Sequence, residues 1–131
     1  MIRVAIVDDN QINRITIKEK LLPYNDIKLI FEASNGEDYF EKLNLLPKEQ
    51  YPHVVLMDLE MPILDGIATI ASGGIKYPTI KYIVLTIYED DDKIFEAVKA
   101  GASGYLLKED KAINIVEAIT NVINFNGIPM S

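Results

Sequence analysis

The sequence contains no cysteine and a single histidine. Without cysteine, the chain has no disulfide bond, no thiolate nucleophile and no Cys-ligated zinc, and it is not a disulfide-stabilised secreted scaffold. Low-complexity tracts are also missing: 49% of the residues are hydrophobic and 25% are charged, which is typical of a folded globular domain. We therefore expect a cytoplasmic protein with one hydrophobic core.

Long apolar runs and an excess of positive charge are absent as well. The first ten residues, MIRVAIVDDN, carry too short an apolar stretch for a signal peptide or a membrane span, so we expect no membrane contact. The 20 acidic and 13 basic residues give a net charge of −7, which argues against direct contact with nucleic acid because such contact needs a basic surface. At 131 residues, one domain is expected.

Short apolar runs divide the chain at regular intervals. They are RVAIV (3–7), KLIFEA (28–33), HVVLM (53–57), KYIVLT (81–86) and the weaker GYLL (104–107). Runs that are apolar on both faces predict strands covered on both sides, and the segments between them are long enough for helices. The α/β pattern predicts a doubly wound five-stranded parallel sheet with helices on both faces and the flavodoxin-like strand order 2-1-3-4-5.

Capping residues, prolines and glycines mark the expected helices. The expected spans are about 12–22, a second after 34–36, a third after 65–66, a fourth from 89–92 to 100–101, and a fifth that ends at 126–127. The third contains Gly73 and Gly74, each of which costs roughly 1 kcal/mol relative to alanine. We therefore expect that helix to be short or bent.

Polar side chains follow the predicted strands directly. They are Asp8 and Asp9 after the first strand, Asp58 after the third, Thr86 at the end of the fourth and Lys108 after the fifth. In a parallel sheet these strand ends meet at one edge, where functional residues collect. A strand-end cap or a surface ion pair explains any one of them alone, but the whole set favours a site.

The chemistry of this set points to a metal and a phosphoryl group. Asp8, Asp9 and Asp58 repel one another unless a cation lies between them. Oxygen ligands without histidine or cysteine suit a hard ion, and Mg²⁺ fits best because it needs few carboxylates. A carboxylate beside Mg²⁺ is prepared to accept a phosphoryl group. Lys108 would then hold the incoming phosphate, and Thr86 would hydrogen-bond a phosphoryl oxygen.

Four motifs resemble the receiver domains of bacterial two-component response regulators in order, spacing and strand context. They are VDD (7–9), MDLEMPILDG (57–66), VLT (84–86) and GASGYLLK (101–108). GASGYLLK and EASNGED (32–38) are most similar to the NarL/FixJ (LuxR-type) regulators. The resemblance implies a signalling switch and not an enzyme.

The resemblance also implies a role for each site residue. Asp58 would be the phosphoacceptor, and a sensor histidine kinase or phosphotransfer protein would be the donor. Lys108 would contact the phosphoryl group. The Mg²⁺ ligands would be Asp8, Asp9, Asp58 and the backbone carbonyl of Glu60.

The resemblance further implies how phosphorylation at the site would change the surface of the domain. Thr86 and Tyr105 would form a switch pair that alters the surface around the fourth helix, fifth strand and fifth helix. Residues 1–125 would be the receiver, and residues 126–131 would begin a linker to a DNA-binding output domain that controls transcription. A natural stand-alone receiver is the alternative, and the sequence leaves open whether the domain forms a homodimer.

Two other functions remain open on the residues alone. A phosphatase of the haloacid dehalogenase kind also uses an aspartate nucleophile and Mg²⁺, but it favours a second aspartate at the position that Glu60 occupies. A flavodoxin-like cofactor binder would place phosphate where Asp8 and Asp9 would repel it. We expect the one histidine, His53, to face solvent at a strand start, away from the acidic edge.

Overall fold

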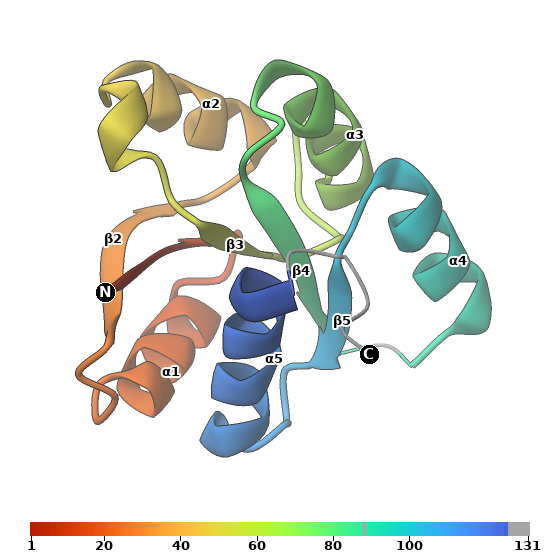
Figure 1. Cartoon of the computed structure of the whole chain (residues 1–131). Coiled ribbons are helices and arrows are strands. Elements are labelled where there is room, and N and C mark those ends of the chain that lie inside the picture. The colour runs from red at the N-terminus through yellow and green to blue at the C-terminus, as the bar shows by residue number, and fades with distance from the viewer. Residues whose placement is uncertain (88, 126–131) are drawn as a thin grey trace.

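Parallel strands form the middle layer of the computed structural model, which describes residues 1–87 and 89–125 (Figure 1). The strands are β1 (Ile2–Val7), β2 (Ile27–Ala33), β3 (Val54–Met57), β4 (Lys81–Thr86) and β5 (Gly104–Leu107). They form one sheet of 5 strands in the order β2-β1-β3-β4-β5, and every neighbouring pair is parallel. The predicted fold class and strand order are therefore confirmed.

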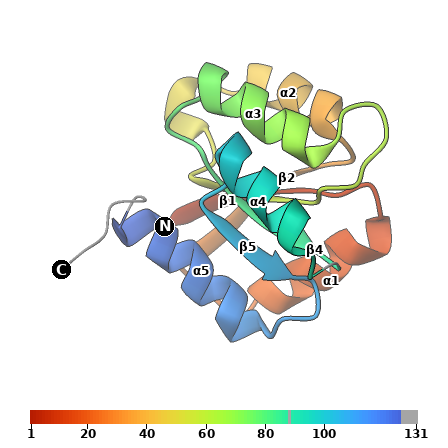
Figure 2. The same cartoon turned by 90° about the vertical axis from the view of Figure 1, so that its right-hand side faces the viewer.

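Helices cover both faces of this sheet (Figures 1 and 2). They are α1 (Gln11–Leu21), α2 (Gly36–Asn44), α3 (Gly66–Lys76), α4 (Asp91–Ala100) and α5 (Ala112–Phe125), with a short 3-10 helix, η1 (Lys48–Gln50), before β3. The helices α1 and α5 lie on one face, and α2, α3 and α4 lie on the other. None of the helices in the described ranges is both long and apolar enough to span a bilayer.

Alternating side chains of the strands divide the core into two layers. Ala5 and Val7 of β1 face α2, α3 and α4, whereas Val4 and Ile6 face α1 and α5. The central strands are buried on both sides, which is why their sequences read as continuous apolar runs. Because every neighbouring pair of strands is parallel, their carboxyl ends lie together at one edge of the sheet.

The helix boundaries follow local capping chemistry. The Asn10 side chain accepts a hydrogen bond from Asn13 N at 3.1 Å and caps the start of α1, and Asp90 accepts from two backbone amides at the start of α4. Gly101 ends α4 with a φ of 118°, which glycine adopts without the strain that a Cβ would cause. The end of the fifth helix expected at 126–127, and the linker expected at 126–131, lie outside the described residues.

Of the two alternatives predicted for the third helix, short or bent, the short one was wrong, because α3 runs without interruption for 11 residues. Gly73 lies against the hydroxyl of Tyr82, so near that a Cβ at this position would come within 2.2 Å of the oxygen. That hydroxyl shares a hydrogen bond of 2.8 Å with the hydroxyl of Tyr39, and both tyrosines are buried. The packing of α3 on this tyrosine pair therefore offsets the low helix propensity of glycine.

We expect opposite effects from alanine at the two neighbouring glycines of α3. Gly73→Ala should lower the free energy of unfolding by about 1–3 kcal/mol, because the new methyl group overlaps the buried Tyr82 hydroxyl. Gly74→Ala should raise it by about 1 kcal/mol, because no atom lies within 4 Å of a Cβ there and alanine is the better helix former. Urea denaturation of both variants checks this, and equal stability of the two would contradict it.

Candidate functional site

Hydrogen bonds of the sheet place two aspartates side by side. Val7 of β1 pairs in register with Met57 of β3, so the next residues in each chain, Asp8 and Asp58, leave the sheet together. Asp58 N donates to Val7 O at 2.9 Å, and Asp8 N donates to the β2 residue Ala33 at 3.0 Å. The ladder thus continues into both aspartates and fixes their backbones.

Three carboxylates meet at this edge. One oxygen each from Asp8, Asp9 and Asp58 lies within 4.8 Å of the other two. Asp8 is 2% exposed and Asp58 is 6% exposed, whereas Asp9 lies at the surface. Burying two like charges this closely is unfavourable unless positive charge compensates them.

Lys108, directly after β5, supplies part of that compensation. Its Nζ lies 2.8 Å from Asp8 Oδ2 and 3.4 Å from Asp58 Oδ1. Asp8 Oδ1 accepts a hydrogen bond from Asn10 N at 2.9 Å. Asp8 Oδ2 is buried without a well-oriented hydrogen bond from the described residues, so its contact with Lys108 is an ion pair. Among the described residues, one ammonium contacts two of the three carboxylates, and negative charge remains in excess.

The pKa shifts of Asp58 and Lys108 reflect this excess of negative charge. Burial and the negative charge of Asp8 together raise the pKa of Asp58 to about 6, because Lys108 opposes them only in part. Burial acts to lower the pKa of Lys108, but its contacts with Asp8 and Asp58 outweigh burial and raise it. The ionised form of Asp58 is therefore disfavoured when no cation is present.

The residues at this edge fit a hard divalent cation. Their donor atoms are carboxylate oxygens without nitrogen or sulfur, their charge is incompletely neutralised, and Asp8 Oδ2 lacks an oriented hydrogen bond. Such a donor set suits Mg²⁺. Asp8, Asp9 and Asp58 are the side chains that could hold it.

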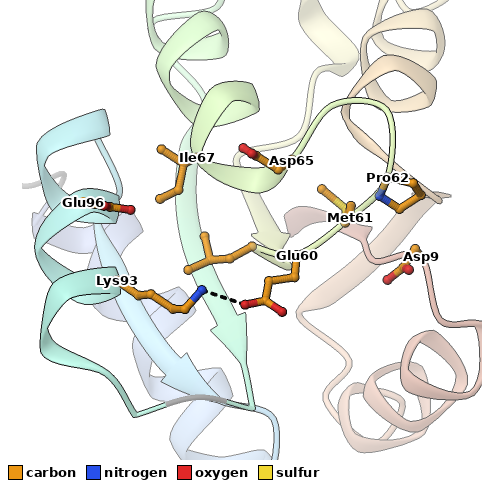
Figure 3. Close-up of a pocket in the computed structure, with 9 residues that line it drawn as sticks. Asp9, Glu60, Met61, Pro62, Asp65, Ile67, Lys93 and Glu96 are labelled. Carbon is orange, nitrogen blue, oxygen red and sulfur yellow. Dashed lines mark hydrogen bonds and ion pairs between the residues drawn. The ribbon is translucent and has the colours of Figure 1, made fainter.

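The side chain of Glu60 lies outside the carboxylate cluster. Its side chain is exposed and forms an ion pair of 2.6 Å with Lys93 of α4, across a pocket of about 490 Å³ that Asp9 also lines (Figure 3). With its carboxylate engaged by α4, Glu60 could contribute to a metal site through its backbone carbonyl. The loop that contains it is close-packed, because a Cβ on Gly66 would come within 2.2 Å of Asp58 O.

Thr86 and Tyr105 lie on neighbouring strands and share one face of the sheet. Thr86 is 1% exposed, and its carbonyl accepts a hydrogen bond of 2.8 Å from Lys108 N. Tyr105 pairs in register with Val84, two residues before Thr86, and packs on the core beneath α2, α3 and α4. Burial and the negative charge of Asp90 raise the pKa of Tyr105, and Lys93 opposes them in part.

The sequence did not predict that α1 would contact the backbone beside the carboxylate cluster. The guanidinium of Arg14 donates to the backbone carbonyl of Asp8 at 2.5 Å and to Glu32 of β2 at 3.2 Å. An arginine on an exposed-looking helix carries no pattern that predicts a contact with a strand end. Arg14 holds the backbone of a candidate metal ligand without touching its carboxylate.

His53 is only partly as expected. It lies directly before β3, at the opposite end of that strand from Asp58, but it is half-buried and does not simply face solvent. Its Nδ1 accepts a hydrogen bond of 2.9 Å from Arg3 N. Burial and the nearby charge of Arg3 lower its pKa. His53 therefore has a structural role as a neutral hydrogen-bond acceptor.

Comparison with known proteins gives consistent matches. The family model for the response regulator receiver domain matches residues 4–120. The transcriptional regulatory protein LiaR of Bacillus subtilis is 40% identical over 119 residues, covering 91% of this chain and 54% of LiaR. LnrK of the same organism is 38% identical over 122 residues, covering 93% of this chain and 54% of LnrK. The chain thus spans about half the length of the curated relatives it matches.

Solved structures agree with the sequence matches. A DNA-binding response regulator of the LuxR family from Staphylococcus aureus superposes with a TM-score of 0.82 at 26% identity, covering 93% of this chain and 98% of that chain. The sheet order and the placement of helices on both faces are those of a flavodoxin-like receiver fold.

We expect Asp58→Asn to stabilise the metal-free protein at neutral pH. The folded-state pKa of about 6 lies above the ordinary 3.8, so folding favours the protonated form, and the charge present at pH 7 is destabilising. Removing it should raise the free energy of unfolding by about 1–3 kcal/mol at pH 7, and the gain should shrink as the pH falls below 6. Urea denaturation in EDTA at pH 7 and pH 5 checks this.

The control for this experiment is Asp26→Asn, which changes an exposed aspartate far from the cluster and should leave stability unchanged. A loss of stability in Asp58→Asn at pH 7, or an equal gain at both pH values, would contradict the charge imbalance at the site.

Proposed function

Because the chain belongs to the response regulator receiver domain family, a family of signalling domains, we propose that it is a switch operated by phosphorylation of Asp58. The donor is the phosphohistidine of a sensor histidine kinase or of a phosphotransfer protein. The observation that carries this proposal is the buried carboxylate cluster with its single lysine. Such an arrangement stores excess negative charge at a point where a cation and a phosphoryl group could bind together.

The reaction itself is a phosphoryl transfer between two side chains. A carboxylate oxygen of Asp58 attacks the phosphorus atom, and the P–N bond of phosphohistidine breaks. Its electron pair stays on the imidazole, and Asp58 becomes an acyl phosphate. Mg²⁺ held by Asp8, Asp9, Asp58 and the backbone carbonyl of Glu60 would supply positive charge that shields the nucleophile from the incoming phosphate. Lys108 would hold a phosphoryl oxygen as a point charge.

The surroundings of each carboxylate favour Asp58 as the nucleophile. Asp8 is held on one oxygen by Asn10 N and on the other by Lys108 at 2.8 Å. Asp58 lies farther from the ammonium, at 3.4 Å, and its raised pKa marks a carboxylate whose charge is poorly compensated. Asp9 lies at the surface, where it can contribute to a metal without occupying the centre of the site.

A phosphatase reaction is less well supported. It would need a general acid two residues after the nucleophile, where Glu60 stands. The Glu60 carboxylate is paired with Lys93 at 2.6 Å and is directed toward α4 (Figure 3). This ion pair favours the switch over the hydrolytic enzyme.

Thr86 and Tyr105 would transmit the effect of Asp58 phosphorylation to the surface of the domain. A phosphoryl oxygen would draw the Thr86 hydroxyl toward it, and the ring of Tyr105 would follow into the space released beside the strand. Both side chains lie on the face covered by α4. The surface of α4, β5 and α5 would then carry the signal.

The output of the switch is proposed from the relatives. LiaR and LnrK are transcriptional regulators by name, and this chain spans about half of each. A DNA-binding output domain, a homodimer and a cytoplasmic location are consistent with that relationship. The receiver itself carries a net charge of −7, so nucleic acid would be contacted by the output domain.

We expect one Mg²⁺-dependent phosphoryl adduct when the protein is incubated with acetyl phosphate. Asp58→Asn should remove the adduct without loss of fold, because the amide is nearly isosteric but is not a nucleophile. Intact-mass spectrometry followed by peptide mapping measures it, and Asp26→Asn serves as the matched control that keeps the adduct. Equal labelling of Asp58→Asn, or labelling independent of Mg²⁺, would contradict the proposed function.

A further inference from the structure

Lys20, near the end of α1, makes contacts that are unusual for a lysine on an outer helix. Its Nζ donates to the backbone carbonyls of Lys108 and Asp110, each at 2.9 Å. Lysine on an outer helix usually extends its ammonium into water. Holding it between two carbonyls 88 and 90 residues away costs side-chain entropy, which charge-assisted hydrogen bonds offset.

The turn that Lys20 contacts carries the site lysine. It follows β5 and leads into α5, and it is closed by a hydrogen bond from Asp110 N to Leu107 O at 3.0 Å. The Asp110 carboxylate also accepts from Leu107 N at 2.9 Å. These bonds fix the shape of the turn, and Lys20 ties the turn as a whole to α1.

Lys108 is consequently held at three points. Its backbone N donates to Thr86 O at 2.8 Å, and its backbone carbonyl accepts from Lys20 at 2.9 Å. Its ammonium reaches back to Asp8 and Asp58, at 2.8 Å and 3.4 Å. The sheet side of the residue is fixed by β4, and the other side is fixed by Lys20.

We propose that Lys20 is a positioning residue for phosphoryl transfer, which holds the turn at 107–111 so that the Lys108 ammonium stays over the two buried carboxylates. This inference rests on the proposed function of Asp58 and adds a residue that never touches the phosphoryl group. Loss of the Lys20 ammonium leaves the Lys108 carbonyl without its charged donor and lets the turn move. A displacement of about an ångström is enough to slow a reaction that depends on positioning.

The competing explanation is that Lys20 only ties α1 to the neighbouring turn. A tie of that kind contributes to stability, and its removal would slow labelling only to the extent that the protein unfolds. The two explanations differ in their dependence on Lys108. A positioning residue acts through Lys108, so its effect disappears when Lys108 is already gone.

The test is the initial rate of Asp58 labelling by acetyl phosphate at saturating Mg²⁺. Lys20→Met keeps the aliphatic stem and removes the donor, and the rate should fall roughly tenfold. Lys20→Arg keeps a charged group that can donate to two carbonyls and should restore most of the rate. The control is Lys28→Met, which removes an exposed lysine at the opposite end of the sheet, beside Arg3, and should label like the wild type.

A double variant separates positioning from stability. Lys20→Met combined with Lys108→Met should label no more slowly than Lys108→Met alone. If Lys20→Met slows labelling by the same factor in both backgrounds, or labels at the wild-type rate, the inference is overturned. Urea denaturation of each variant shows that folded proteins are compared. If Lys20→Met does not fold, Lys20→Gln against Lys20→Arg decides in the same way.

Failure of the inference is distinguishable from failure of the proposed function. If the wild-type chain acquires no adduct on Asp58, the proposed function fails and the inference falls with it. If the wild type is labelled on Asp58 and Lys20→Met is labelled equally fast, the inference alone fails.

Discussion

Repulsion between the buried carboxylates of Asp8 and Asp58 governs the chemistry at this edge of the sheet. Asp58 N donates to Val7 O of β1 and Asp8 N donates to Ala33 O of β2, so the ladders on the two sides of β1 fix both backbones. One lysine compensates part of the charge, and the pKa of Asp58 rises to about 6 because burial and Asp8 outweigh Lys108. A folded protein retains such an unfavourable cluster when the stored charge serves a function. In the function that we propose, the excess charge would prepare the edge of the sheet for a cation and a phosphoryl group.

The two faces of the fold serve this site in different ways. On one face, α1 reaches both sides of the cluster: Arg14 holds the carbonyl of Asp8, and Lys20 holds the carbonyl of Lys108. On the other face, α4 is attached more loosely, since Ala97 is the one fully buried residue among its 10 residues, all of them described. A helix with so little buried surface is the element whose position a small change at the site can shift. In the function that we propose, the face that carries Arg14 and Lys20 would maintain the chemistry, and the face that carries α4 would transmit the change.

The fold could be predicted from the sequence because the apolar runs are short, regular and followed by polar residues. The convergence of Asp8 and Asp58 followed from the parallel arrangement alone. The prediction of a short third helix failed because helix propensity is local, whereas Gly73 packs against Tyr82, which lies in β4. The contacts of Lys20 could not be predicted, because its partners lie 88 and 90 residues away in the sequence. A lysine on a helix shows no sequence pattern that predicts hydrogen bonds to distant backbone carbonyls. Local patterns thus predict which elements form and where their ends meet, but not the long-range contacts that hold the ends in place.

We propose that the three carboxylates form a single site for a divalent cation, and titration of Mg²⁺ followed by backbone amide NMR tests this claim. We predict one saturable transition, with the largest shifts at the amides of Asp8, Asp9, Asp58 and Lys108. The acidic run at 89–92 is an internal comparison, because it is exposed at the start of α4 and its Asp90 side chain already caps the helix. Shifts that do not saturate, or that are as large at 89–92 as at Asp8 and Asp58, would contradict the claim.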